Sequence, residues 1–138
     1  MKKFVVVLAC MALLVSANAQ QATAPAANAN FAAFQWASST HDFGKIKQGV
    51  PVTHEFKFTN SGKTPLIITN VQASCGCTTP AWTKDPVPPG GEGYIKATYN
   101  ASAVGAFNKT VTVTANIEAG FVQLNIKGEV ETSTPPNK

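Results

Sequence analysis

Two cysteines separated by one glycine, Cys75-Gly76-Cys77, are the residues whose type and spacing best suit chemistry. At this spacing the Cα atoms can approach the roughly 4.4–6.8 Å that a disulfide accepts, although the ring is tight. We expect Gly76 to help, because it removes the Cβ that would obstruct the bend. Two thiolates can also hold Cu(I), and free thiols can simply pack. A local disulfide, a copper or redox role and inert packing stay open, with the disulfide favoured.

Further metal ligands are scarce. A structural zinc site needs four ligands, and the only imidazoles are His41 and His54. His54 alternates with Val52 and Phe56, so we interpret it as a core-edge histidine with a hydrogen-bond partner. His41 is expected at the surface or at a strand end. No cofactor is predicted apart from possible copper at Cys75 and Cys77.

A candidate binding loop, Thr78, Pro80 and Trp82, follows the cysteines. A tryptophan beside prolines offers a large apolar area at low entropy cost, which suits a binding platform. Trp82 can equally cover the open end of a β-sandwich, and we favour that lid over the platform.

Catalytic patterns are missing from the sequence. The seven acidic residues form no local pair, and Gly-x-Ser-x-Gly, His-Glu-x-x-His and phosphate-binding glycine loops are absent. We therefore predict that the protein is not an enzyme.

The first 19 residues have the organisation of a secretory signal peptide. A basic start is followed by the apolar run Phe4–Val15 and by the small-x-small pattern Ala17-Asn18-Ala19. The apolar run is about 12 residues, against roughly 20 for a membrane span. We predict cleavage after Ala19 and export to the periplasm or beyond, with lipid attachment at Cys10 as the alternative. Exported thiols tend to oxidise, which favours the disulfide.

The mature chain has three predicted parts. Residues 20–35 are rich in Ala, Asn, Gln, Thr and Pro, which predicts a flexible leader, and residues 131–138 form a polar tail. The domain is expected over residues 36–130. Loss of Lys2 and Lys3 lowers the net charge from +4 to +2, and there is no arginine, so nucleic acid is not a predicted partner.

Apolar residues recur with a period of two through the domain. Alternating segments are residues 52–59, 94–99, 110–117 and 122–128, and a further strand is expected from Leu66 towards the cysteines. Glycine, proline and asparagine turns separate them, and no helical period is present. The pattern predicts an all-β fold: a single immunoglobulin-like antiparallel β-sandwich of about seven strands with Greek-key connections.

Several strings together resemble a known bacterial family. They are Asp42-Phe43-Gly44-Lys45-Ile46, residues 56–62, Ser74-Cys75-Gly76-Cys77-Thr78 and Pro88-Pro89-Gly90. The family is called domain of unknown function 1573, and the resemblance covers about residues 40–130. It implies an exported immunoglobulin-like sandwich related to major-sperm-protein-type modules, and it brings no settled function.

The predicted fold and the predicted export together favour one functional class. We predict an exported, non-catalytic immunoglobulin-like module that binds or positions another component of the cell envelope, with no membrane span in the mature chain. The alternative is a thiol-based function at Cys75 and Cys77, either copper binding or disulfide exchange.

Overall fold

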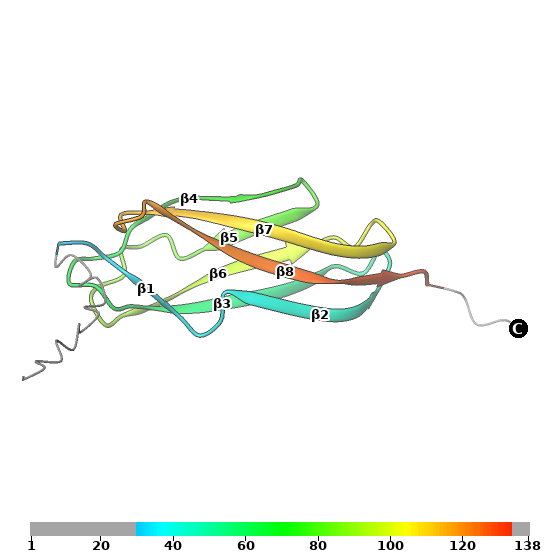
Figure 1. The fold of residues 1–138 in the computed structure, drawn as a ribbon, viewed down its shortest axis with the longest axis horizontal. Helices are drawn as coiled ribbons and strands as arrows, with labels where there is room; N and C mark the ends of the chain where they lie inside the picture. The colour runs from blue at the N-terminus through cyan, green and yellow to red at the C-terminus, as the bar shows by residue number, and fades with distance from the viewer. Residues whose placement is uncertain (1–29, 134–138) are drawn as a thin grey trace, which may run out of the picture.

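The computed structural model describes residues 30–133. Within this range eight strands form two stacked four-stranded sheets (Figure 1). The strands are β1 (Phe34–Trp36), β2 (Thr40–Lys47), β3 (Val52–Asn60), β4 (Ile68–Ala73), β5 (Thr78–Trp82), β6 (Glu92–Tyr99), β7 (Gly105–Ala115) and β8 (Phe121–Glu131). The first sheet has the order β1-β3-β6-β5 and the second β2-β8-β7-β4. The predicted all-β, immunoglobulin-like sandwich is confirmed, with one strand more than expected.

Some sequence predictions fall beyond this range. The signal peptide over residues 1–19 with Cys10, most of the leader (20–29) and the last residues of the tail (134–138) lie outside the described residues. Among the residues that are described, no helix combines the length and apolar character needed to cross a membrane.

The core lies between the two sheets and follows the alternation of the sequence. Phe56 of β3, Ile95 of β6, Val111 of β7 and Leu124 of β8 are buried, whereas their sequence neighbours point outward or are half-buried. Burial of each such side chain stabilises the fold by about 1.5–3 kcal/mol. The period-two pattern therefore specifies which face of each sheet turns inward.

One pair of strands corrects the antiparallel prediction: β2 runs parallel to β8. β1 and β2 point the same way along the sandwich, because the chain passes from one sheet to the other between them without reversing (Figure 1). Ser38 makes the bend, its hydroxyl donating to the Thr40 carbonyl at 2.7 Å, and the Ser39 carbonyl accepts from the Asn125 amide at 2.9 Å. The second strand, β2, thus lies beside the last strand, β8.

The domain begins earlier than residue 36, which corrects the end of the predicted leader. Ala32 is buried and forms a bridge with Ile117, and Phe34 pairs with Asn60. Phe34 also stacks on Trp36 with ring centroids 4.7 Å apart. The aromatic residues of this segment bury enough apolar surface to offset the cost of ordering it.

The sandwich has two ends with different connections. The N-terminal end contains residues 30–33 and the turns 61–65, 86–91 and 116–120. The cysteine end contains the turns 48–51, 74–77 and 100–104. In Figure 1 these ends lie at the left and right of the molecule, and the last described residues leave from the cysteine end.

A buried amide side chain ties the N-terminal end together. Asn60 is 0% exposed, and its Oδ1 accepts hydrogen bonds from the backbone N–H groups of Ala33 at 3.3 Å and Gly62 at 3.0 Å. Its Nδ2 donates to the carbonyls of Thr64 at 2.8 Å and Val87 at 2.9 Å. One side chain therefore satisfies backbone groups of three separate segments, of which the Val87 carbonyl is buried and the others are partly buried.

Candidate functional site

The cysteine pair forms the connection between β4 and β5. Cys75 and Cys77 are joined by a disulfide, with Cα atoms 5.3 Å apart. The Cys77 carbonyl accepts a hydrogen bond from the Asn100 amide at 3.0 Å, so the neighbouring turn also holds the loop. Thr78 Oγ1 lies 3.8 Å from Cys75 Sγ, within reach of a weak hydrogen bond to sulfur. The redox state of this pair in the cell stays a prediction.

Gly76 does not have the steric role that we expected from the sequence. A Cβ added at Gly76 would meet no heavy atom within 4 Å, and its φ lies outside the left-handed region. Gly76 is exposed, and the space around it is open apart from the two neighbouring cysteines. A bulkier residue between the two cysteines is therefore compatible with this backbone.

The predicted binding loop is a strand whose candidate residues face inward. Thr78, Pro80 and Trp82 lie on β5, opposite Tyr99, Ala97 and Ile95 of β6. Thr78 is 4% exposed, and Trp82 is half-buried against the core. Lys84 Nζ lies 3.0 Å from the Trp82 ring centroid and covers its outer part. The indole therefore packs against the side of the sandwich with Lys84 over its ring, and a binding role for Thr78, Pro80 and Trp82 stays a prediction.

The two histidines, far apart in the sequence, meet in space. The rings of His41 on β2 and His54 on β3 are stacked, with centroids 3.6 Å apart and planes 6° from parallel. His54 is a core-edge residue, as expected, but this ring contact holds it in place of the predicted hydrogen bond. Burial lowers the pKa of His54, the His41 ring lowers it further, and Glu55 partly opposes both.

The cysteines and histidines do not join into a metal site. Over residues 30–133 no three His, Cys, Asp or Glu side chains converge in a way that could hold a metal ion. The two cysteines are bonded to each other, so a copper ion would need the disulfide to be reduced first. Copper at Cys75 and Cys77 stays a prediction for the reduced protein.

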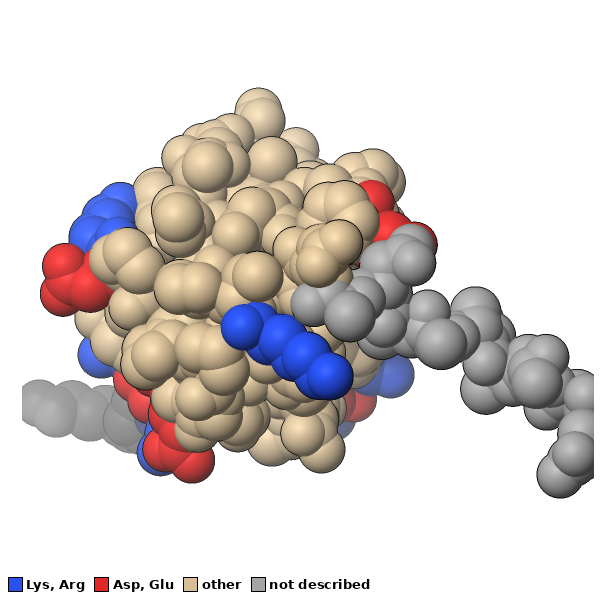
Figure 2. Space-filling model, turned by 90° about the vertical axis from the view of Figure 1, so that its left-hand side faces the viewer, with Lys and Arg blue, Asp and Glu red and all other residues tan. Residues whose placement is uncertain are grey.

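An apolar groove, which sequence analysis missed, opens at the N-terminal end. It has a volume of about 460 Å³. Its apolar walls, here called the N-terminal groove, come from Phe31, Phe34, Trp36, Ile117, Phe121 and Val122. Phe31 is 43% exposed and Phe121 is 54% exposed, and Lys63 and Glu118 lie at the border. Figure 2 looks onto this end and shows mainly uncharged side chains.

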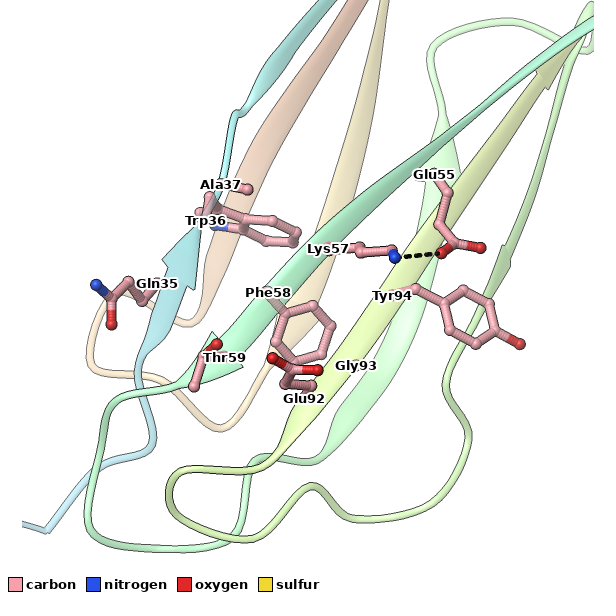
Figure 3. Close-up of a pocket in the computed structure, with 10 residues that line it drawn as sticks. All are labelled: Gln35, Trp36, Ala37, Glu55, Lys57, Phe58, Thr59, Glu92, Gly93 and Tyr94. Carbon is pink, nitrogen blue, oxygen red and sulfur yellow. Dashed lines mark ion pairs between the residues drawn. The ribbon is translucent and has the colours of Figure 1, made fainter.

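A second groove, of about 540 Å³, lies along β1, β3 and β6 (Figure 3). Glu55, Lys57 and Tyr94 lie along it, and Lys57 Nζ is 4.0 Å from Glu55 Oε1. Trp36 borders both grooves, and its Nε1 is buried without a hydrogen-bond partner among the described residues. The second groove is mixed in character, since aliphatic stems and ion pairs line it, and it offers less apolar surface than the N-terminal groove.

Solved structures place the fold among immunoglobulin-like domains. A protein of unknown function from Porphyromonas gingivalis W83 is 18% identical with a TM-score of 0.65, over 73% of this chain and 48% of that chain. The ASH/PapD-like domain 7 of human CEP192 is 10% identical with a TM-score of 0.59, over 87% and 97%. The secreted serine protease VesC from Vibrio cholerae is 15% identical with a TM-score of 0.58, over 74% and 24%.

This chain therefore spans about half of the Porphyromonas protein and a quarter of the protease, and at these identities the likeness shows the fold alone. The class is an immunoglobulin-like β-sandwich. The chain belongs to the family described as protein of unknown function (DUF1573), which matches residues 34–130 and confirms the resemblance seen in the motifs. No curated protein matches the chain.

Proposed function

We propose that the protein is an exported, non-catalytic module that binds another protein of the cell envelope through the N-terminal groove. The observation that carries the proposal is the exposure of Phe31 and Phe121 beside the groove. Large aromatic side chains that stay exposed around a concave apolar surface are typical of binding sites. The proposed site is at the end opposite the cysteine loop, whereas sequence analysis expected binding beside the cysteines at Thr78, Pro80 and Trp82.

The groove favours an apolar, uncharged segment as its occupant. Among the described residues that line it, the charged ones are Lys63 and Glu118, whose opposite charges leave this lining with no net charge to attract an acidic or basic ligand. Aromatic residues at the centre of an interface supply most of its binding energy once water is excluded. A partner that inserts aliphatic or aromatic side chains between Phe31 and Phe121 has the matching chemistry.

Photocrosslinking tests this proposal in intact cells. A benzophenone amino acid replaces Phe121 in the full chain, and the matched control carries it at Val104, which is 51% exposed at the cysteine end. We expect a crosslink at position 121 to an apolar, uncharged peptide of an envelope protein, and loss of that crosslink on Phe31→Glu. Equal labelling from both positions, a charged peptide, or a crosslink to the chain's own residues 20–29 would overturn it.

A thiol-based function is the second candidate, favoured by the hydroxyl of Thr78 beside Cys75 Sγ. A partner dithiol would attack Cys77 Sγ, the Cys75–Cys77 bond would break, and Cys75 would leave as a thiolate that then takes a proton. The second thiol of the partner would then release Cys77 reduced and leave the partner oxidised. Hydrogen bonding from Thr78 would stabilise the leaving thiolate.

Intact mass with and without alkylation reports whether the thiols are bonded in cells. Anaerobic Cu(I) titration of the reduced protein, in competition with a chelator, tests the copper form of this function. Copper affinity that is unchanged in the Cys75→Ser/Cys77→Ser variant eliminates that form. A reduction potential below about −300 mV marks the bond as structural and eliminates exchange.

A further inference from the structure

His41 and His54 meet where each sheet has an outer strand. β2 is the outer strand of the second sheet, and β1 pairs with β3 only over Phe58–Asn60. At His54, β3 is therefore the outer strand of the first sheet. The stacked imidazoles form a direct side-chain contact between the two sheets along this open side.

Aromatic rings enclose the pair on both sides. Phe43 meets His41 edge-on with centroids 4.6 Å apart, and Phe56 meets His54 in the same way at 4.6 Å. Neither imidazole has a hydrogen bond or an ion pair within the described part of the chain. The contact is therefore an aromatic one, which suits neutral rings and offers no acceptor for an imidazolium N–H.

We propose that His41 and His54 form an acid-sensitive latch between the two sheets, closed while the rings are neutral and loosened when they are protonated. Protonation of both rings brings two positive charges into stacked contact beside apolar side chains. Like charges at this distance repel, and the partly buried site weakens their solvation. β2 is the element released, because it is an outer strand whose pairing with β8 already shifts register between Asp42 and Lys45.

The nearest acidic groups are engaged elsewhere. Glu55 is adjacent to His54 on β3, and its carboxylate pairs with Lys96 of β6 at 3.4 Å and with Lys57 at 4.0 Å. Asp42 follows His41 on β2 and pairs with Lys127 of β8 at 3.9 Å. Neither carboxylate forms an ion pair with an imidazole, so Glu55 offsets only part of the new charge.

The other strands packed around the latch add no acid. Lys109 of β7 lies in the same cross-strand row as His41, beyond Ile126 of β8, and adds positive charge. Tyr99 of β6 is buried and stacks on Phe107 with centroids 4.1 Å apart. The surroundings thus disfavour a doubly protonated pair.

Two measurements on the full chain test the latch. NMR follows the ring signals of both histidines between pH 8 and pH 4, and amide hydrogen exchange, corrected for intrinsic rates, follows β2. We expect the titration midpoint of His54 to rise in His41→Phe, which keeps a ring but loses the charge. We expect wild-type β2 to lose roughly tenfold protection on acidification, while the centre of β7 keeps its own.

In His41→Phe the loss of β2 protection should fall below about twofold, since only one charge can form. His41→Gln is the second neutral variant and gives the same result if the phenylalanine disturbs folding. An unchanged His54 midpoint in the neutral variants overturns the proposal. Acid-induced loss of β2 protection that is as large in these variants as in the wild type also overturns it.

Discussion

The two ends of this sandwich hold their turns together by different interactions. At the N-terminal end the buried amide of Asn60 joins residues 30–33 to the turns around Thr64 and Val87 by hydrogen bonds. At the cysteine end a disulfide closes a loop of three residues, and backbone hydrogen bonds such as Gly49 N–H to the Ala101 carbonyl, 2.9 Å, connect the turns.

The covalent bond is the more local of the two devices. A disulfide between residues two apart constrains only its own loop, whereas Asn60 reaches segments up to 27 residues away. Long-range hydrogen bonds made by a buried side chain couple whole turns, and their loss leaves buried backbone groups without partners. The N-terminal end therefore couples its turns through one buried side chain, whereas at the cysteine end backbone hydrogen bonds connect the turns and the disulfide stays local.

The largest expected effect comes from Asn60→Ala. Four hydrogen bonds are lost, and the buried Val87 carbonyl keeps only its bond from the Leu66 N–H, so we expect a loss of about 3 kcal/mol in the free energy of unfolding. Urea denaturation measures it. The matched control is Asn116→Ala, which also loses two backbone contacts, to Ile67 and Pro65, but in exposed positions. A loss at Asn60 no greater than at Asn116 would contradict the comparison.

The second effect compares one glycine from each end. A Cβ at Gly62 would lie 2.5 Å from the Phe31 carbonyl oxygen and 2.6 Å from Ala32 Cα, and backbone atoms cannot swing aside. We expect Gly62→Ala to destabilise by about 2 kcal/mol through this overlap. Gly76→Ala should change stability by less than about 0.5 kcal/mol. Similar thermal unfolding midpoints for the two variants would break the comparison.

The third effect concerns the disulfide itself. In the chain-entropy description, a three-residue loop contributes about 1.5 kcal/mol or less. Cys75→Ser/Cys77→Ser should therefore retain the fold and lose less stability than Asn60→Ala, as measured by urea denaturation without reductant. Global unfolding of the double variant would show that the cysteine end stabilises the whole domain.

The smallest effect is a pH dependence that spares both ends. Because burial lowers the pKa of folded His54, the unfolded chain binds more protons below its ordinary value of about 6.5. The stability that the folded state gains from a neutral His54 is therefore complete above pH 6.5 and is lost as the pH falls towards the folded pKa. The stability difference between wild type and His54→Gln should change between pH 7.5 and pH 5.5. A constant difference would contradict it.

Regular alternation was enough to predict the long strands. Phe56 and Phe58, or Val111 and Val113, repeat every second residue, which is the geometry of a strand with one buried face. β2 was not predicted from the sequence, because its inward-facing residues change phase at Gly44, where the pairing with β8 shifts register. β5 was not predicted from the sequence, because Pro80 interrupts a short polar run. The proline is tolerated because β5 lies at the edge of its sheet.

The candidate sites also include one feature that the sequence could predict and one that it could not. The closeness of Cys75 and Cys77 is a local property of residues two apart, so sequence reasoning could propose their disulfide. The N-terminal groove combines Phe31 with Phe121, and no local pattern links positions so far apart. The sequence shows that both residues are hydrophobic. That both are exposed beside one groove depends on how the strands are connected.

The sequence by itself determined the long alternating strands, their inward faces, the principal turns and a cysteine pair able to bond, because each depends on neighbours along the chain. Only the tertiary structure decided that His41 stacks on His54, that Asn60 joins three segments, and that an apolar groove opens at the end opposite the cysteines. Such contacts depend on strand order and register between distant segments, and a period of two carries no information about either.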